Sequence, residues 1–374
     1  MRIIIYNDLV FGGGTETLLR IFTNFFLKKG NDITIVASPE DPNDFKKAFP
    51  MGVCCIRGRL PKKNYKNKLF SGCYSIIRKA YRALTILRIK AKKFDVAISM
   101  IEGHNMKEVA SLRAGKKLVW IQCDFENFHN RSWYKKVYSS PEEELECMKS
   151  YDKIVCVSET AKAGLIETVG DTGNLCVRYN PIDWRKIREL SEETCAFSKN
   201  LSRKLIVAVG RLFPDKNYKC LLDACDLLKN ELDFELWIVG DGPQKGELAE
   251  YIISKNLTNV KLLGFQANPF PIIKQADLFV SSSISESYGL SVQEALILGV
   301  PVVAVKCSGI VESLNPEFGV LVDNSSEELS KAIRELLSNP DELDAYRSFI
   351  KNNYSLNSLF DDDRMESIYQ LLEE

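Results

Sequence analysis

Short apolar runs recur along this chain, and most are separated from the next by a stretch with helical character. The first series of such runs comprises residues 2–6, 33–37, 95–100, 117–121, 153–157 and 177–179. After a polar stretch, a second series comprises residues 204–209, 236–239, 260–263, 278–280 and 302–305. Strands that alternate with helices in this way are typical of a doubly wound, mainly parallel sheet. The two series therefore predict two α/β domains in a chain of 374 residues.

The composition is that of an ordinary globular protein, with 45% hydrophobic and 27% charged residues. The 11 cysteines are scattered, without a Cys-x-x-Cys pair, which favours reduced thiols over a disulfide framework or a zinc site. The chain shows neither a signal-peptide pattern nor the roughly 18 consecutive apolar residues that a membrane-spanning helix needs. We therefore expect a cytoplasmic protein, and one interpretation adds a peripheral contact with the inner face of the cell membrane.

A glycine triplet, Gly12-Gly13-Gly14, follows the first predicted strand. It lacks the Gly-x-Gly-x-x-Gly spacing of a dinucleotide-binding turn, so a nicotinamide-linked dehydrogenase is disfavoured. A plain tight turn would account for these glycines. In the alternative interpretation, their bare backbone lies close to a bound ligand, and Glu16 on the first helical turn faces the same ligand.

Small and charged residues follow the first strands of the second series: Gly210, Arg211 and Lys216, then Gly240-Asp241-Gly242-Pro243, then Gly264-Phe265-Gln266. The carboxyl ends of parallel strands meet at one edge of a sheet, where such folds bind ligands. Arginine and lysine five residues apart on one loop can converge on a diphosphate, because arginine binds through a planar fork and lysine as a point charge. The sequence therefore predicts an anionic ligand at this edge.

Residues 281–305 are the stretch that tells most about the ligand. A loop of Glu286, Ser287, Tyr288 and Gly289 leads into a helix predicted over residues 291–298, which carries Glu294. Free backbone N–H groups and the helix dipole favour phosphate at such a helix N-terminus. The two glutamates would repel phosphate, so they are better suited to accept hydrogen bonds from sugar hydroxyls. This combination indicates a nucleotide-sugar.

Two predicted strand ends in the first half also carry polar residues. Glu102 and His104 follow the strand at residues 95–100, and Gln122 follows the strand at residues 117–121. Their position after parallel strands makes them candidates for a ligand site, although an ordinary surface histidine is the alternative for His104. The chain has only 2 histidines, and they are too isolated to predict a metal site.

Residues 57–93 contain thirteen Lys or Arg and no Asp or Glu. A helix predicted over residues 69–91 carries an apolar stripe of Phe70, Cys73, Ile77, Ala80, Leu84 and Leu87. One interpretation is a core-facing helix with a solvated basic side. The other is a contact with an anionic membrane surface, to which each basic residue contributes about 1 kcal/mol. RNA or other nucleic acid is disfavoured, because few aromatic residues stand between the basic ones.

The ordered motifs of the second half resemble those of a known family. Gly210-Arg211 with Lys216, Gly240-Asp241-Gly242-Pro243, Leu263-Gly264, and Glu286 with Glu294 before Gly299-Val300-Pro301 are similar to the motifs of the family-4 retaining glycosyltransferases of the GT-B fold, or group 1 glycosyltransferases. Gly13-Gly14-Thr15-Glu16 resembles the acceptor-side loop of the same family. The resemblance implies two Rossmann-like domains, which we expect at residues 1–183 and 184–354, and a C-terminal helix at residues 355–374 that packs back on the first domain.

The resemblance also implies roles for individual residues. Arg211 and Lys216 would hold the donor diphosphate and stabilise the leaving group, so neither a metal nor a cofactor is expected. Glu286 would complete the catalytic set by binding the donor sugar, and Glu294 would bind the ribose. The other donor-binding residues would be Gly210, Gly240, Gly242, Phe265, Ser287, Tyr288, Gly289 and Leu290. The acceptor-side residues would be Gly13, Gly14, Glu16, Glu102, His104 and Gln122.

One position departs from the family pattern. Many relatives carry a histidine after the Trp-Ile-type strand of the first domain, and Gln122 stands in its place here. Glutamine can hydrogen-bond a sugar hydroxyl but cannot become charged. The departure puts in doubt any role assumed for a histidine at this position.

Together these features predict a metal-independent retaining glycosyltransferase of cell-surface polysaccharide synthesis, such as lipopolysaccharide or capsule. It would move a hexose or N-acetylhexosamine from a UDP-sugar to a polyprenyl-diphosphate-linked glycan. GDP-mannose is the alternative donor. A sugar-nucleotide epimerase of GT-B-like architecture and a non-catalytic nucleotide-sugar sensor are the alternatives from other classes.

Overall fold

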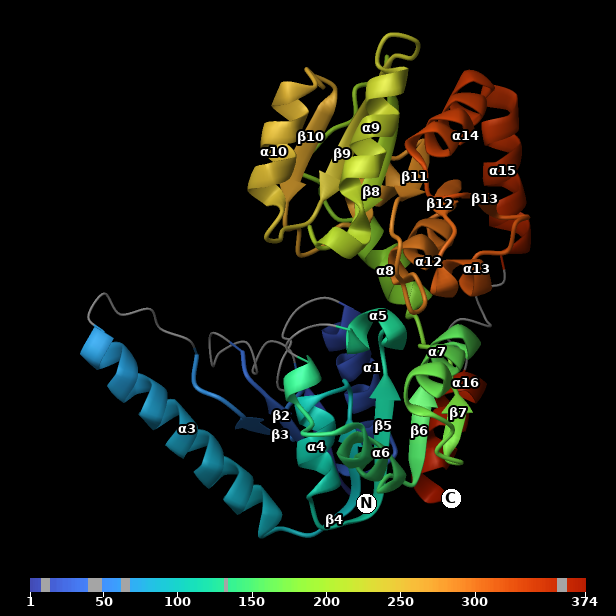
Figure 1. Cartoon of the computed structure of the whole chain (residues 1–374). Helices are drawn as coiled ribbons and strands as arrows, with labels where there is room; N and C mark the ends of the chain where they lie inside the picture. Colours follow the sequence, from blue (N-terminus) through green and yellow to red (C-terminus); the bar gives the residue numbers. More distant parts are fainter. Residues whose placement is uncertain (8–13, 40–48, 62–67, 131–133, 355–361) are drawn as a thin grey trace. The chain divides into compact units, whose positions relative to one another are not determined.

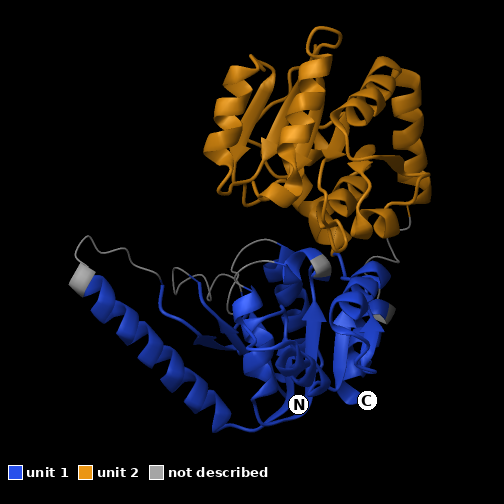
Figure 2. Ribbon diagram, viewed as in Figure 1, with its two compact units in different colours: residues 1–182, 361–374 blue, residues 183–360 orange. Residues whose placement is uncertain are grey.

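The computed structural model describes residues 1–7, 14–39, 49–61, 68–130, 134–354 and 362–374. The chain divides into two compact units (Figure 2). Unit 1 consists of residues 1–182 and 361–374, and unit 2 consists of residues 183–360. The first unit is therefore assembled from both ends of the sequence.

Unit 1 is built around a seven-stranded sheet in which all described neighbours are parallel (Figure 1). Its strands are β1 (Arg2–Asn7), β2 (Asp32–Ala37), β3 (Cys54–Arg57), β4 (Phe94–Ser99), β5 (Ala114–Ile121), β6 (Lys153–Cys156) and β7 (Leu175–Val177), in the spatial order β3-β2-β1-β4-β5-β6-β7. Ile3, Ile4 and Ile5 of the central strand β1 are all fully buried. A strand covered on both faces reads as a continuous apolar run, as this one does.

The helices of unit 1 are α1 (Gly14–Lys28), α3 (Lys68–Lys90), α4 (His104–Ala110), α5 (Phe125–His129), the 3-10 helix η1 (Tyr134–Lys136), α6 (Pro141–Lys149), α7 (Glu159–Val169) and α16 (Asp362–Glu373). α1 packs on the sheet through Phe22, whose ring centroid lies 5.2 Å from that of Trp120 on β5. Ser158 begins α7 by accepting a hydrogen bond from the Ala161 N–H at 3.0 Å, as helix-capping serines do.

The last helix, α16, belongs to unit 1. Its Met365 and Ile368 are fully buried. The Tyr369 hydroxyl accepts a hydrogen bond from Asn31 Nδ2 at 3.0 Å, and Glu366 forms an ion pair with Lys29. The C-terminal segment thus completes the core of the first unit.

Unit 2 is built around a six-stranded sheet, again parallel at every described pair. Its strands are β8 (Lys204–Val209), β9 (Phe234–Val239), β10 (Val260–Gly264), β11 (Leu278–Ser281), β12 (Val302–Val305) and β13 (Gly319–Val322), in the order β10-β9-β8-β11-β12-β13. Its helices are α8 (Trp184–Ser191), the 3-10 helix η2 (Pro214–Lys216), α9 (Tyr218–Leu228), α10 (Lys245–Ser254), α11 (Phe270–Lys274), α12 (Leu290–Ile297), α13 (Ser308–Ser313), α14 (Ser326–Ser338) and α15 (Pro340–Asn353).

Two buried clusters cover the two faces of this sheet. Ile206 and Ala208 of β8 belong to the cluster that includes α9 and α14, whereas Leu205 and Val207 belong to the cluster that includes α11 and α12. Successive strand residues point to opposite faces, so β8 contributes to both clusters. The core therefore runs through the sheet on both sides.

The predicted α/β fold class is confirmed, and the predicted strands correspond to observed ones. The sequence did not predict β3 and β13. Both are four residues long and lie at sheet edges. Edge strands are covered less completely, and β3 has no fully buried residue, so its pattern in the sequence is weak.

The predicted apolar stripe of α3 is not core-facing, so that interpretation is wrong. Most large apolar residues of the helix are exposed: Phe70 63%, Ile76 68%, Ile77 56%, Leu84 56% and Leu87 63%. A different face is buried at the end of the helix, where Thr85 and Ile89 are 8% and 1% exposed. Polar contacts also hold the helix. Arg78 and Tyr81 donate hydrogen bonds to the carbonyl groups of Leu60 and Arg57 at 3.0 and 3.2 Å, and Arg82 pairs with Glu108 of α4. The apolar stripe is consequently left open to solvent.

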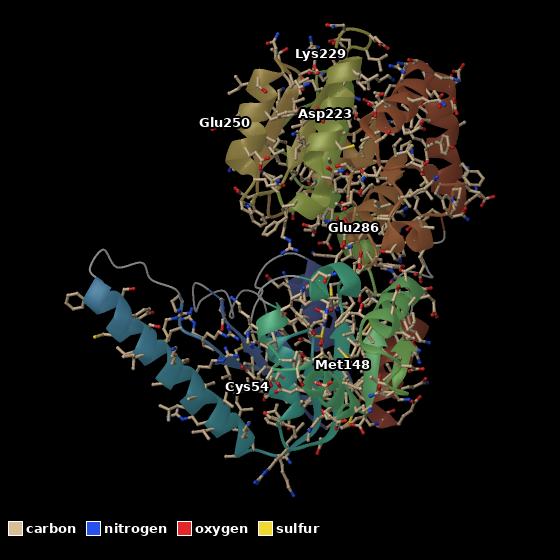
Figure 3. All side chains as sticks on the ribbon, viewed as in Figure 1. Cys54, Met148, Asp223, Lys229, Glu250 and Glu286 are labelled. Carbon is tan, nitrogen blue, oxygen red and sulfur yellow. The ribbon has the colours of Figure 1, made fainter. Side chains whose placement is uncertain are left out.

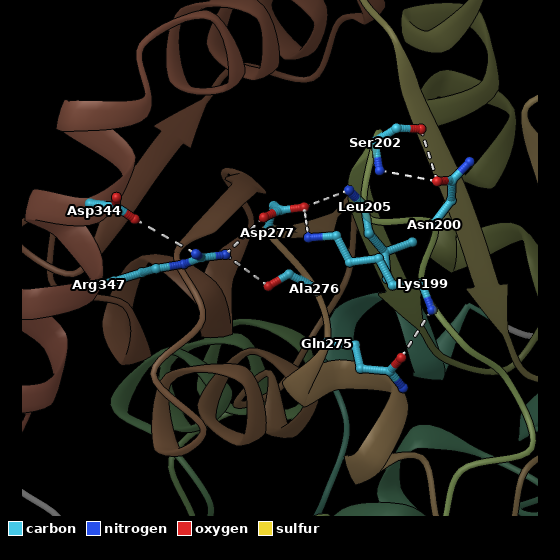
Figure 4. Close-up of polar contacts among 9 residues, drawn as sticks. All are labelled: Lys199, Asn200, Ser202, Leu205, Gln275, Ala276, Asp277, Asp344 and Arg347. Carbon is cyan, nitrogen blue, oxygen red and sulfur yellow. Dashed lines mark hydrogen bonds and ion pairs between the residues drawn. The ribbon is translucent and has the colours of Figure 1, made fainter.

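A buried carboxylate fastens the amino ends of β8 and β11 (Figure 4). Asp277, 4% exposed, accepts a hydrogen bond from the Leu205 N–H at 2.7 Å and pairs with Lys199 and Arg347. Burial alone would raise the Asp277 pKa, but these hydrogen bonds and the charges of Lys199 and Arg347 hold it below its usual value. Asp277 thereby joins α15 to the sheet.

We expect Asp277→Asn to lower the free energy of unfolding at pH 7 by roughly 2–3 kcal/mol, because two cations lose their shared partner. The contribution of the carboxylate is fully present above its unfolded-state pKa of about 4 and is lost as the pH falls through the lower folded-state pKa. The difference between the two proteins in urea denaturation should therefore shrink below about pH 4.

Asp233→Asn is the matched control, since Asp233 is 66% exposed and pairs with Arg203 on the surface. It should change stability by no more than about 0.5 kcal/mol. Equal denaturation midpoints for wild type and Asp277→Asn at pH 7 would show that Asp277 does not fasten the sheet.

Candidate active site

The loops that follow the strands of unit 2 meet at one edge of its sheet, because the strands are parallel. The Gly210 N–H donates to the Val239 carbonyl at 3.0 Å, and the Gly240 N–H donates to the Gly264 carbonyl at 2.9 Å. Figure 3 shows Glu286 at the opposite end of unit 2 from Lys229. The loops predicted to bind a ligand thus lie side by side at the carboxyl edge.

Two of the predicted glycines are needed for close backbone packing. At Gly240, with φ of 148°, an added Cβ would lie 1.9 Å from the Gly210 carbonyl oxygen. At Gly242 an added Cβ would lie 2.5 Å from the Leu212 carbonyl oxygen. Because both neighbours are backbone atoms, no side-chain movement can relieve the overlap. The loops after β8 and β9 therefore pack main chain against main chain.

The structure pairs two of the predicted catalytic residues. Lys216 Nζ donates to Glu286 Oε1, and their side chains are only 16% and 15% exposed. Two further hydrogen bonds join the loops after β8 and β11. Ser282 Oγ donates to the Lys216 carbonyl at 2.8 Å, and the Ile284 N–H donates to the Asp215 carbonyl at 2.9 Å. Sequence reasoning assigned Lys216 and Glu286 to different parts of a ligand and missed both their contact and Ser282.

Arg211, the third predicted catalytic residue, is exposed. Its guanidinium carbon lies 5.1 Å from the centre of the Phe213 ring. No carboxylate in the described chain pairs with it. Arg211 is therefore a cation at the carboxyl edge that can bind an anion without first losing a described carboxylate partner.

The loop before α12 ends in Gly289, whose φ of 67° and ψ of 51° are left-handed and suit glycine. Leu290 begins the helix, one residue earlier than predicted. Backbone N–H groups in the first turn of a helix have no helical partner and attract anions. Tyr288 is buried, and Ser287 precedes it on the same loop.

Glu294 lies on the second turn of α12 and is partly exposed. Burial raises the pKa of its carboxyl to about 7. No donor within the described residues bonds to this carboxylate. A largely desolvated acid with no partner is typical of a site that a ligand completes. At the end of β10, Phe265 follows Gly264 and is 68% exposed, so its ring is available for stacking.

At the carboxyl edge of the unit 1 sheet, Glu102 fixes the loop after β5. It is 3% exposed, and it accepts hydrogen bonds from the N–H groups of Gln122 and Cys123, the latter at 3.1 Å. Burial raises the Glu102 pKa even though these hydrogen bonds oppose the rise. His104 is the first residue of α4. Burial and the positive charges of Arg59 and Lys107 lower its pKa, which favours the neutral ring.

Gln122 has a partner that the sequence did not predict. Its Oε1 accepts a hydrogen bond from Asn180 Nδ2 at 3.0 Å. Asn180 is 4% exposed, and its carbonyl accepts from Arg364 of α16 at 3.2 Å. In the sequence, Asn180 stands out only as the residue before Pro181. That position does not predict a tertiary contact.

Of the predicted glycine loop, Gly13 lies outside the described residues. Gly14 is the first residue of α1 and is exposed. Glu16 lies on the first turn of α1, as expected from its place after the glycines.

Two features are absent from the residues that the structure describes. They contain no group of three or more His, Cys, Asp or Glu side chains arranged to hold a metal ion. Among the helices that the structure describes, none is both long enough and apolar enough to cross a membrane.

Comparison with known proteins identifies the relatives of this chain. Residues 191–356 match the family model described as glycosyl transferases group 1. An uncharacterized glycosyltransferase of Methanocaldococcus jannaschii is 26% identical over 66% of this chain and 64% of its own length. A Campylobacter jejuni protein named N-acetylgalactosamine-N,N'-diacetylbacillosaminyl-diphospho-undecaprenol 4-alpha-N-acetylgalactosaminyltransferase is 34% identical over 40% of each chain. The match thus spans less than two thirds of the length of each of these two relatives. An uncharacterized glycosyltransferase of Haemophilus influenzae is 26% identical over 88% of both chains.

Solved structures share the whole fold at low sequence identity. The Anabaena protein Alr3699/HepE, in complex with UDP and glucose, gives a TM-score of 0.76 at 17% identity and covers 100% of this chain and 99% of its own. Sucrose-phosphate synthase of Thermosynechococcus elongatus gives 0.74 at 17% identity, covering 100% and 98%. The predicted relationship to the group 1 glycosyltransferases and the predicted GT-B architecture are confirmed.

We expect Glu294→Gln to stabilise the protein at alkaline pH. A carboxyl whose pKa rises from about 4 when unfolded to about 7 when folded weakens the fold as the pH rises between these values. The variant should therefore exceed wild type by roughly 1–3 kcal/mol above pH 7 and match it below about pH 4 in urea denaturation. Glu335→Gln, at an exposed position of α14, should show no such trend. If Glu294→Gln shows none either, the carboxyl is not desolvated.

Proposed function

We propose that this relative of the group 1 glycosyltransferases transfers a hexose or N-acetylhexosamine from a UDP-sugar to a glycan acceptor with retention of configuration. The observation that carries the proposal is the Lys216–Glu286 ion pair at the carboxyl edge of unit 2, where the Lys216 side chain also lies next to Gly210, the residue before Arg211. This edge lies within the residues that match the family. Cations for a diphosphate and an acceptor of sugar hydroxyls are thus neighbours in one site.

The diphosphate of the donor binds to Arg211 and Lys216 in this proposal. Arg211 has no described carboxylate partner to give up, whereas Lys216 shares its charge between Glu286 and phosphate. As the bond from sugar to phosphate breaks, negative charge grows on the leaving oxygen, and the two cations stabilise it. They supply the charge that a divalent metal supplies in other transferases, so the reaction needs no metal or other cofactor.

The sugar and nucleoside bind to the neighbouring residues. Glu286 accepts hydrogen bonds from hydroxyls of the donor sugar, which orients the anomeric carbon. Backbone N–H groups at the start of α12 bind phosphate. Glu294 accepts from the ribose hydroxyls, and the exposed ring of Phe265 stacks on the base. Gly240 and Gly242 serve the nucleotide indirectly, because they let the loop after β9 pack closely against the loop that carries Arg211.

The acceptor hydroxyl attacks the anomeric carbon on the face from which the diphosphate leaves. A phosphate oxygen of the leaving group takes the proton of the acceptor, so no separate protein base is required. The new bond forms on the same face as the old one, and the configuration is retained.

The acceptor binds to unit 1 through Gly13, Gly14, Glu16, His104 and Gln122, with Glu102 holding the loop. We take it to be a polyprenyl-diphosphate-linked glycan of cell-surface polysaccharide synthesis. The Campylobacter jejuni relative, whose name includes a diphospho-undecaprenol acceptor, supports this class. Gln122 contributes an uncharged amide, which suits a neutral sugar hydroxyl.

Helix α3 attaches the enzyme to the cytoplasmic face of an anionic membrane in this proposal. Its exposed apolar residues enter the interface, and Lys79, Arg88, Lys92 and Lys93 face lipid phosphates. Burying one exposed isoleucine or leucine contributes about 1.5–3 kcal/mol, and each basic residue near the surface about 1 kcal/mol. The exposure of these apolar side chains supports insertion into the interface in addition to attraction by charge.

GDP-mannose is the second candidate donor. A Mycobacterium tuberculosis relative named as a GDP-mannose-dependent mannosyltransferase is 24% identical over 51% of each chain. The residues assigned to phosphate and ribose would serve either nucleotide. UDP is preferred because Alr3699/HepE, which shares the fold over the full chain, has been solved in complex with UDP-glucose.

The donor is tested by thermal shift with UDP, GDP, ADP and NAD, followed by transfer assays with the corresponding sugars. UDP alone should stabilise the protein, by roughly 2.7 kcal/mol at about 100 times its Kd. Arg211→Ala should lower kcat by about 10²–10³-fold, because it removes one charge from the transition state. Arg334→Ala, a partly exposed arginine on α14 that pairs with Glu231, is the control and should leave kcat unchanged. A thermal shift with GDP alone would indicate that the donor is a GDP-sugar. Conversion of the UDP-sugar without any acceptor would indicate an epimerase.

Membrane attachment is tested by sedimentation with vesicles of anionic and of neutral lipid at low salt. Wild type should bind the anionic vesicles, and Ile77→Ser/Leu84→Ser should bind at least about tenfold more weakly because less apolar surface is buried. Ile253→Ser is the control, since Ile253 is 78% exposed on α10. Equal vesicle binding by wild type and the α3 variant would refute the assignment.

A further inference from the structure

Helix α13 presses against the main chain of the segment that carries Glu286. The Gly309 N–H donates to the Glu286 carbonyl oxygen at 2.9 Å, and Ser308 Oγ donates to the same oxygen at 3.2 Å. Two donors from the first turn of α13 therefore hold one carbonyl group. Neither Ser308 nor Gly309 belongs to the residues assigned to substrate above.

The approach is so close that only glycine fits at position 309. An added Cβ would lie 2.3 Å from the Ser287 carbonyl carbon and 2.4 Å from the Glu286 carbonyl oxygen. Gly309 is buried, and both neighbours are backbone atoms. An alanine there must push residues 286 and 287 away from α13.

The other side of the segment is held by the loop after β8. Lys216 bonds to the Glu286 carboxylate, and the Asp215 carbonyl accepts from the Ile284 N–H at 2.9 Å. Glu286 is thus fixed at both ends, its carbonyl by α13 and its carboxylate by Lys216. A shift of the main chain would change where the carboxylate lies relative to a sugar held by the phosphate site.

We propose that Gly309 is a positioning residue for catalysis, which sets the place of the Glu286 carboxylate through the main chain, with Ser308 as its auxiliary. The inference rests on the proposed function, because it assigns Glu286 to the donor sugar. Gly309 itself touches no substrate. Its effect should therefore fall on the sugar and leave the nucleoside diphosphate unaffected.

The experiment compares Gly309→Ala with wild type in urea denaturation, UDP-induced thermal shift and steady-state transfer from the UDP-sugar. We expect Gly309→Ala to lose about 10²-fold in kcat, because a displacement of about 1 Å is enough for such a loss. Its affinity for UDP should stay within about twofold of wild type, since Arg211 and Glu294 are untouched. Ser308→Ala removes one of the two donors without an overlap, and it should lose a few-fold in kcat and remain fully folded.

Gly246→Ala is the matched control, since Gly246 lies on α10 and an added Cβ would meet nothing within 4 Å. It should leave all three measurements unchanged or raise stability slightly. If wild type transfers sugar and both Gly309→Ala and Ser308→Ala keep its kcat, the inference is overturned while the proposed function stands. If Gly309→Ala loses UDP binding together with kcat, the role is structural and the inference is likewise overturned. Wild type that neither binds UDP nor transfers sugar would overturn both.

Discussion

The parallel direction of the strands in both sheets determines where this protein can bind ligands. In a parallel sheet every loop that follows a strand emerges at the same edge, so residues far apart in sequence become neighbours there. Lys216 and Glu286 are 70 residues apart and form an ion pair for this reason. The loops are held tightly against each other, because at Gly240 no room exists even for one added carbon atom. Preorganised loops of this kind can hold charges in fixed places, which is what stabilisation of a leaving diphosphate requires.

Much of the fold could be predicted from the sequence, because buried parallel strands appear as uninterrupted apolar runs. The edge strands β3 and β13 could not, since short and partly covered strands leave a weaker pattern. Among the site residues, the glycines and charged side chains after the strands are local features that a sequence displays directly. Contacts that depend on tertiary packing cannot be predicted from the spacing of residues in the sequence. They include Lys216 with Glu286, Gln122 with Asn180 and Gly309 with Glu286. The stripe on α3 was visible, but a periodic pattern cannot tell whether the apolar side meets a core or solvent.

Two carboxylates of unit 2 differ in a way that separates structure from function. Asp277, before β11, accepts from Leu205 and faces two cations, and its pKa is lowered. Glu294, on α12, has no donor in the described chain, and its pKa is raised to about 7. The first arrangement stabilises the fold, whereas the second weakens it whenever the acid is ionised. Proteins tolerate such a loss of stability where a ligand later donates hydrogen bonds to the buried group. Glu294 lies where we place the nucleotide.

The position of α16 has a consequence for the order in which the protein is made. Unit 2 is one continuous stretch, whereas unit 1 needs Met365, Ile368 and Tyr369 from the end of the chain to close its core around Asn31 and Phe26. During synthesis the ribosome must therefore release all of unit 2 before the first unit can be finished. Until then, the part of the unit 1 core that α16 covers stays exposed while unit 2 is being made. The core of the first unit can thus be completed only after the residues of α16 have been translated.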